Sequence, residues 1–248
     1  MHRSVRIALA VTLILASLAI HSSLDLECRN CEGITIASWN VQNLGPTKLD
    51  DGRAHRIASF ISEHDIIIIQ EITDASGRTA HEMCRAFENH SCIVSERTGS
   101  GTRKEQYLIA SKYPLSNDRL VEHPDLERGI LKADIDLGNR NITISTAHVK
   151  PDRVAEELRT IETLLNSTNV LAGDLNADCR YLPEGTARYF ERMHWIIPDT
   201  QDTTPAASRC AYDRFVVSSD LLGYVSGYRI EHTPDGLSDH HAIVLVLS

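Results

Sequence analysis

The run 65–72, DIIIIQEI, constrains the fold more than any other stretch of the sequence. Its β-branched residues favour a strand, and its apolar residues occupy successive positions instead of alternating with polar ones. A strand of this kind is buried on both faces, as happens when a sheet is covered on each side by another layer. The chain must therefore form a sheet with packed layers on both of its faces.

Strand and helix patterns alternate along the rest of the chain, with no internal repeat. Helical spacing of apolar residues predicts helices at 50–64, 76–89 and 151–165. Further strands are predicted at 34–41, 105–111, 129–137, 141–149, 169–176, 213–218, 225–230 and 241–247. This order predicts an α/β protein in which sheets carry helices on their outer faces.

The first 22 residues do not fit this domain. Two arginines, Arg3 and Arg6, precede an apolar run at 7–20, which is the pattern of a secretory signal peptide. The run is short for a membrane span, so an uncleaved N-terminal anchor is the second interpretation. We expect a signal peptide at 1–22, a short linker at 23–33 and one catalytic domain at 34–248, located outside the cytoplasm.

Six cysteines suit an oxidising compartment. Cys28 and Cys31 form a C-x-x-C pair without a second pair at zinc spacing, which favours a local disulfide. The other four cysteines are Cys84, Cys92, Cys179 and Cys210. All could be paired, with Cys84–Cys92 a candidate because the two lie close together, but the sequence leaves the connectivity open.

The chain is acidic. Its formal net charge is −9, and loss of residues 1–22 removes two arginines and no acid, which moves the charge to −11. No long basic run is present, which argues against a protein that coats nucleic acid without specificity. A nucleic-acid substrate would have to be held by a local site with its own cation.

Polar residues of three types recur at the ends of the predicted strands. Asn40, Glu71, His148 and the pair Asp174/Asn176 end strands, whereas Asp213 and the pair Asp239/His240 begin them. A lone Asp-x-Asn is better explained as a turn or a helix cap. Six such positions, all carboxylate, amide or imidazole, favour a common functional rim.

The residue types indicate the chemistry of that rim. Asn40, Glu71 and Asp239 offer the hard oxygen ligands that Mg²⁺ prefers. Asp174 and Asn176 could add a ligand and a hydrogen bond to a phosphate. Two histidines, each with a partnering acid, could take a proton from water and give one to a leaving oxygen.

Seven stretches in the right order resemble the motifs of the endonuclease/exonuclease/phosphatase superfamily, and its deoxyribonuclease I branch in particular. They are IASWNVQNLG, IIIIQEI, RKEQYLIA, TAHVKPD, LAGDLNADC, TTPAASRCAYDRFVV and SDHHAIVLVL, and the resemblance runs from about residue 34 to residue 248. The resemblance implies a four-layer sandwich of two packed mixed β-sheets flanked by helices.

The resemblance also implies roles for individual residues. His148 would pair with Glu105, and His240 with Asp213. The divalent ion, Mg²⁺ with Mn²⁺ as a substitute, would lie near Asn40, Glu71 and Asp239. Asp174 and Asn176 would surround the scissile phosphate, Arg128 would reach DNA phosphate, and Cys179 would be bonded to Cys210.

The chain departs from the branch at several positions. Gln42 and Thr73 replace two arginines, and Arg103 replaces a tyrosine that stacks in the DNA groove, which leaves Arg103 and Arg128 as the candidate substrate contacts. Asp202 and Thr204 resemble part of a structural Ca²⁺ loop, although Ala206 replaces one of its hydroxyl ligands. Catalysis is therefore better supported by the resemblance than groove contact.

The leading interpretation is a secreted, Mg²⁺-dependent deoxyribonuclease that acts as a monomer on DNA, without a stable protein partner. A phosphatase or a sphingomyelinase-like phosphodiesterase of the same superfamily is the alternative. Lipid enzymes of that group use exposed aromatic hairpins, and aromatic residues are scarce here, at 5%. A catalytically inactive binding protein on the same fold is the third interpretation. The presence of every acid–base and metal residue argues against it.

Overall fold

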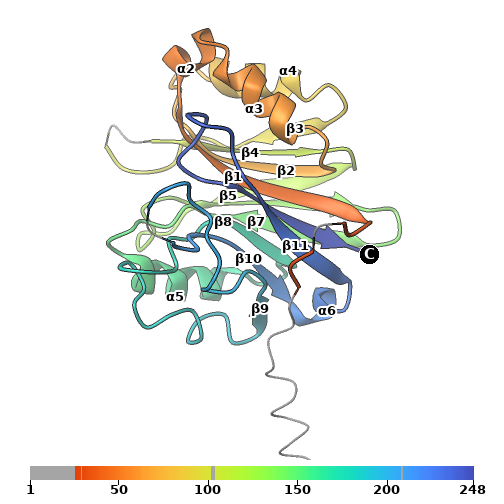
Figure 1. Ribbon diagram of the computed structural model, residues 1–248, viewed down its shortest axis with the longest axis vertical. Coiled ribbons are helices and arrows are strands. Elements are labelled where there is room, and N and C mark those ends of the chain that lie inside the picture. The colour runs from red at the N-terminus through yellow and green to blue at the C-terminus, as the bar shows by residue number, and fades with distance from the viewer. Residues whose placement is uncertain (1–25, 29, 102–103, 208) are drawn as a thin grey trace, which may run out of the picture.

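The computed structural model describes residues 26–28, 30–101, 104–207 and 209–248. Two six-stranded sheets pack face to face, and helices cover their outer faces (Figure 1). The first sheet has the spatial order β11 (Val225–Glu231), β12 (Ala242–Leu247), β1 (Ile34–Leu44), β2 (Ile66–Ile72), β4 (Gln106–Ser111) and β3 (Ser91–Val94). This architecture is the sandwich that the sequence predicts.

The second sheet has the order β5 (Leu115–Val121), β6 (Ile130–Asp136), β7 (Asn141–Thr146), β8 (Val170–Asp174), β10 (Asp213–Ser218) and β9 (Met193–Trp195). Within the two sheets β1 pairs with β2 and β7 with β8 in parallel, whereas the other neighbours are antiparallel. Both sheets are therefore mixed.

Strand β2 shows why the isoleucine run requires two covered faces. Ile66 and Ile68 belong to the core between the sheets. Ile67 and Ile69 belong to a second core under the helices. Each of the four is fully buried. Successive side chains of a strand point to opposite faces, so an unalternating run supplies apolar side chains to both cores.

The helices lie on the outer faces of the sandwich (Figure 1). Helix α3 (Arg53–Ile61) packs on the first sheet through Ile57 and Ile61, beside α4 (Arg78–Ala86). Helix α5 (Val154–Leu164) packs against the second sheet through Leu158 and Ile161. The short helices α2 (Pro46–Asp50) and α6 (Ser219–Leu222) complete the described set.

The segment predicted as a linker contacts the first sheet where it is described. Glu27 forms a parallel bridge with Tyr228 of β11, and the Cys28 amide donates to the Tyr228 carbonyl at 2.8 Å. Gly227 permits this approach, because a Cβ atom there would lie 2.6 Å from Cys28 Sγ. The apolar run 7–20, predicted as a signal or anchor, lies outside the described residues, and no helix among the described residues has the length and hydropathy of a membrane span.

Two disulfides are present among the described cysteines. Cys28 is bonded to Cys31, and Cys179 to Cys210, as predicted. The expectation of a Cys84–Cys92 disulfide is wrong for this structure, in which both are half-buried thiols. The two thiols lie on α4 and β3.

Candidate active site

A bulge between β1 and β2 forms the floor of the site. The register of this parallel pair shifts between Asn40 and Leu44, and Gln42, Asn43 and Glu71 have positive φ angles of 52°, 50° and 65°. Such conformations are uncommon outside glycine and re-aim side chains at the end of a strand. The Glu71 carboxylate accepts hydrogen bonds from Asn40 Nδ2 at 2.9 Å and from the Asn43 amide at 2.7 Å.

Asp174 lies at the centre of the site, at the end of β8. Its Oδ2 atom accepts a hydrogen bond from Asn40 Nδ2 at 3.1 Å. The same oxygen is 3.5 Å from His148 Nε2 and 3.6 Å from His240 Nε2. The two imidazoles therefore present their Nε2 atoms to one point.

The residue before Asp174 explains how the two strands approach. Gly173 has a φ of 146° inside β8, and a Cβ atom there would lie 2.1 Å from the Ala147 carbonyl oxygen. In the structure β8 continues through Asp174, and Gly173 is required because the backbone that carries His148 passes too close for a side chain.

His148 and Glu105 form the first imidazole–carboxylate pair. His148 Nδ1 lies 2.9 Å from Glu105 Oε1, and its backbone N–H donates to the Tyr107 hydroxyl at 3.1 Å. Glu105 is 2% exposed and is held in an isolated antiparallel bridge with Thr98. On its other side, Arg128 Nε lies 2.8 Å from Glu105 Oε2.

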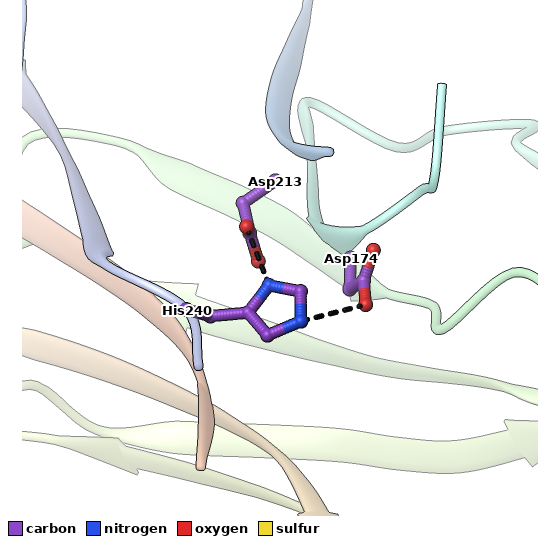
Figure 2. A group of neighbouring side chains, drawn as sticks. All are labelled: Asp174, Asp213 and His240. Atoms are coloured by element: carbon purple, nitrogen blue, oxygen red, sulfur yellow. Dashed lines mark hydrogen bonds and ion pairs between the residues drawn. The ribbon is translucent and has the colours of Figure 1, made fainter. Parts of the chain in front are cut away.

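His240 and Asp213 form the second pair (Figure 2). His240 Nδ1 lies 2.8 Å from Asp213 Oδ2, while Nε2 faces Asp174. The His240 carbonyl accepts the indole N–H of buried Trp39 at 2.9 Å. Each ring thus has its Nδ1 on a carboxylate, which fixes the tautomer of the neutral ring and leaves Nε2 to react.

The surrounding acids raise the pKa of both histidines. Burial lowers the pKa of His148, but the charges of Glu105 and Asp174 more than offset this and raise it to about 9. Burial likewise lowers the pKa of His240, and Asp213 and Asp174 raise it to about 10. Burial raises the pKa of Asp174, because its charged form is taken out of water.

The three predicted metal ligands, Asn40, Glu71 and Asp239, differ in their contacts and exposure. Asn40 and Glu71 are bonded to each other at the floor of the site, whereas the Asp239 side chain is 59% exposed, with Oδ1 3.9 Å from His240 Nε2. A further group comprises Asp174, Asp213 and His240, whose potential ligand atoms lie within 4.8 Å of one another. These carboxylate, amide and imidazole donors have the chemistry to hold a divalent cation.

Asn176 lies beside Asp174, and its side chain contacts the backbone of the neighbouring segment. Its side-chain amide donates to the Val149 carbonyl at 2.9 Å, and its backbone N–H donates to Asp174 Oδ1 at 3.1 Å. It thereby joins the β8 end to the segment after His148. Asp178 similarly orders the loop beyond, through its bonds to the Cys179 and Ala211 amides at 2.7 Å.

The two predicted substrate contacts have separate outcomes. Arg128 lies in the site, with its side chain only 13% exposed and its Nε atom engaged with Glu105. Its Nη1 atom is buried and has no hydrogen-bond partner within the described residues. Arg103 lies outside the described residues.

Two supporting residues have weak sequence signals. Ser238 Oγ donates to the Asn40 carbonyl at 2.7 Å and accepts the His240 amide at 3.1 Å, so it ties two site strands together. Arg214 is fully buried, donates to the Ala177, Ile197 and Ala211 carbonyls and contacts Asp199 at 2.7 Å. Their proximity to Asp239 and Asp213 in sequence was the available clue.

The predicted Ca²⁺ loop is closed by its own hydrogen bonds. Asp202 Oδ1 accepts the Thr204 and Cys210 amides at 3.2 and 3.3 Å. The loop is thus ordered next to the Cys179–Cys210 disulfide by protein groups.

The protein is thus a two-sheet α/β sandwich with a cluster of acids and imidazoles at one end of the packed sheets. The model of the endonuclease/exonuclease/phosphatase family matches residues 37–240. The chain belongs to this family.

Two relatives and two solved structures illustrate the similarity. Deoxyribonuclease-1 of Sus scrofa is 27% identical, over 86% of this chain and 91% of the relative. Deoxyribonuclease gamma of Homo sapiens is 28% identical, over 93% and 88%. A Danio rerio (D. rerio) TDP2 complexed with a single-strand DNA product superposes with a TM-score of 0.68 at 17% identity, covering 88% of this chain and all of that one.

Sphingomyelinase C of Streptomyces griseocarneus superposes with a TM-score of 0.64 at 16% identity, covering 88% of this chain and all of that one. This chain shares its fold with both structures, and the two enzymes differ in substrate. The fold alone therefore does not select between DNA and a phospholipid head group.

Proposed function

We propose that this protein is a secreted, Mg²⁺-dependent endonuclease that hydrolyses phosphodiester bonds of DNA. The observation that carries the proposal is the convergence of His148 Nε2 and His240 Nε2 on Asp174, at 3.5 and 3.6 Å, with each Nδ1 on a buried carboxylate. Two such nitrogens beside one point suit a reaction that takes a proton from water and gives one to a leaving oxygen.

The chain's own groups divide this work. Glu105 and Asp213 hold the two rings and stabilise their charged forms. With pKa values raised to about 9 and 10, both rings are protonated at neutral pH in the metal-free protein, so each can donate a proton from Nε2. One ring must lose its proton to serve as the base, and the other retains it as the acid.

The donors fit a bound cation. We assign the role of holding Mg²⁺, or Mn²⁺ in its place, to Asn40, Glu71 and Asp239, with Asp174 adjacent. When bound, the cation would offset the negative charge of the phosphate. It would also weaken the effect of the Asp174 charge on the two imidazoles, which favours the neutral form of the base. Asn176 keeps Asp174 in place through its backbone N–H.

The scarcity of exposed apolar side chains among the described residues supports DNA rather than a lipid as the substrate. Among the described residues, Tyr224 is the exposed large hydrophobic side chain, at 42%. An enzyme that works on a membrane needs a larger apolar docking surface. The similarity to deoxyribonuclease-1 and deoxyribonuclease gamma gives independent support.

A location outside the cytoplasm is supported by the two disulfides, by those relatives and by the signal-like segment 1–22. We propose residues 34–248 as the catalytic domain, acting as a monomer without a stable protein partner.

The proposal is tested by nicking of supercoiled plasmid DNA with Mg²⁺, with EDTA, and with Mg²⁺ restored after EDTA. We expect nicking that EDTA abolishes and Mg²⁺ restores. Nicking that persists in EDTA would contradict the metal assignment. Failure to cut DNA together with hydrolysis of sphingomyelin vesicles would transfer the substrate to the alternative branch.

A further inference from the structure

The Glu105–His148 pair depends on two separate loops. His148 follows β7, and Arg128 lies in the segment 122–129 between β5 and β6. Both contact the same carboxylate: His148 Nδ1 is 2.9 Å from Glu105 Oε1, and Arg128 Nε is 2.8 Å from Glu105 Oε2. The orientation of Glu105 therefore depends on how far apart the two loops are held.

A carboxylate outside the site joins these loops. Glu157, in the first turn of α5, is 1% exposed. Its Oε1 atom accepts the backbone N–H of Glu127 at 3.0 Å, and its Oε2 atom accepts the backbone N–H of Lys150 at 3.0 Å. The first bond lies one residue from Arg128 and the second lies two residues from His148.

Such a buried acid is costly, which makes its position informative. Burial raises the pKa of Glu157, and the two amide bonds act in the opposite direction. A carboxylate is acceptor-only, so both of its oxygens can receive N–H groups at once. Few other side chains could satisfy two amides from two loops in this geometry.

We propose that Glu157 is a positioning residue for the active site: its carboxylate fixes the Arg128 loop against the His148 loop and thereby orients the Glu105–His148 pair. The proposal rests on the proposed function for its kinetic consequence, but its structural consequence can be measured without substrate. The hydrogen bonds of Glu157 to Glu127 and Lys150 join the two loops, and its charge also acts on Arg128.

Glu157→Gln is the variant that tests this. The glutamine has almost the same volume, but one of its two polar ends is an NH₂ donor and would face a backbone N–H donor. One loop would lose its acceptor. Glu156→Gln is the matched control, because Glu156 is the adjacent acid, its side chain is 68% exposed and the charge change is identical.

Two readouts are needed. The first is the ¹H NMR resonance of the His148 Nδ1 proton in the substrate-free protein, identified by its loss in His148→Ala. We expect Glu157→Gln to shift or broaden this resonance and Glu156→Gln to leave it unchanged. The second is kinetic: Glu157→Gln should lower kcat by about 10-fold or more with KM changed less than about twofold, since sub-ångström misplacement of reacting groups costs rate.

The possible results separate the two ideas. An unchanged resonance in folded Glu157→Gln overturns the positioning role, whatever happens to kcat, and so does an equal effect of Glu156→Gln. If Glu157→Gln does not fold, Glu157→Asp, whose shorter carboxylate keeps the charge but cannot span both amides, is judged by the same readouts. A perturbed resonance in a protein that cuts no DNA would support the positioning role and reject the proposed function.

Discussion

Asp174 is the residue that the two histidines of the site share. It is buried, lacks an arginine or lysine partner among the described residues, and instead faces two imidazoles and the amide of Asn40. Its position follows from its neighbour, since Gly173 allows the His148 backbone to pass next to β8. A buried acid in such company is stabilised when a cation or a protonated ring is beside it.

Arg128 differs at this scale from the contact expected from sequence alone. It is largely buried and forms an ion pair with Glu105 through Nε, at 2.8 Å, while Nη1 has no hydrogen-bond partner among the described groups. We predict that it both lowers the pKa of His148 and offers a guanidinium N–H to a phosphate. In the nicking-inactive His148→Ala background, Arg128→Gln should weaken duplex binding and reduce the slope of log K against log salt by about 0.9.

That prediction is measured by fluorescence anisotropy over a salt series, with Arg159→Gln on the exposed face of α5 as control. An unchanged slope would mean that Arg128 serves Glu105 alone. In the wild-type background the same Arg128→Gln change should raise the pKa of His148 above about 9, because the nearby positive charge that lowers it is gone.

Among the elements, the strands that the sequence predicts are those buried on both faces or alternating in polarity. The three missed strands, β3, β5 and β9, all lie at the edges of the two sheets. β5, with the sequence LSNDRLV, is exposed over most of its length and so has no apolar pattern to detect. The helices α2 and α6 were missed because each has at most five residues.

The sequence predicted which residues form the candidate site, but not the long-range contacts that hold them in place. The residue types at strand ends indicated which side chains gather, because strand ends in one sandwich share a rim. Long-range partners such as Glu157, Arg214 and Tyr107 were not predictable, since their roles depend on backbone groups brought near by the fold. The Arg128–Glu105 contact was also not predictable, because the fold brings together two side chains that are 23 residues apart in the sequence.

Helix α4 provides a prediction at the scale of an element. Asp74, 2% exposed, accepts hydrogen bonds from the amides and hydroxyls of Ser76 and Thr79 at the start of the helix. Burial raises the pKa of Asp74, but these bonds more than offset it and lower the pKa to about 2. Asp74→Asn should reduce the free energy of unfolding at pH 7 by about 1–2 kcal/mol.

The pH dependence gives the control. Because the pKa of Asp74 is lower in the folded protein than the usual 3.8, its stabilisation is present above pH 3.8 and is lost as the pH falls toward 2. The stability difference between wild type and Asp74→Asn, from urea unfolding, should therefore shrink across that window. Asp118→Asn, an exposed acid in β5, should show no such difference, and a constant gap for Asp74→Asn would be evidence against the bonds.

Across the described residues of the molecule, the two disulfides have very different spans. Cys179–Cys210 joins residues 31 apart around the loop that leads to Asp213, whereas Cys28–Cys31 joins residues three apart. Loop-closure entropy grows with loop length, so the longer bridge should contribute more to stability.

We predict that Cys179→Ser/Cys210→Ser lowers the free energy of unfolding by about 2–4 kcal/mol. Cys28→Ser/Cys31→Ser should cost less. Urea unfolding of the two double variants against wild type decides the order. The reverse order would show that the loop between Cys179 and Cys210 is held mainly by other contacts, of which the bonds of Arg214 are the foremost.

The central claim is that His148 and His240 act together at one phosphodiester. Single-turnover cleavage of duplex DNA by wild type, His148→Ala, His240→Ala and the double variant tests it most directly, with His55→Ala on α3 as the control. We predict that each single variant loses about 10²–10⁴-fold in rate, because acid–base help of this size disappears. Since groups that act as a unit are not additive, the double variant should be little slower than the slower single one. A single variant that retains near-wild-type rate, or a double variant whose loss is the full product of the two, would contradict the claim.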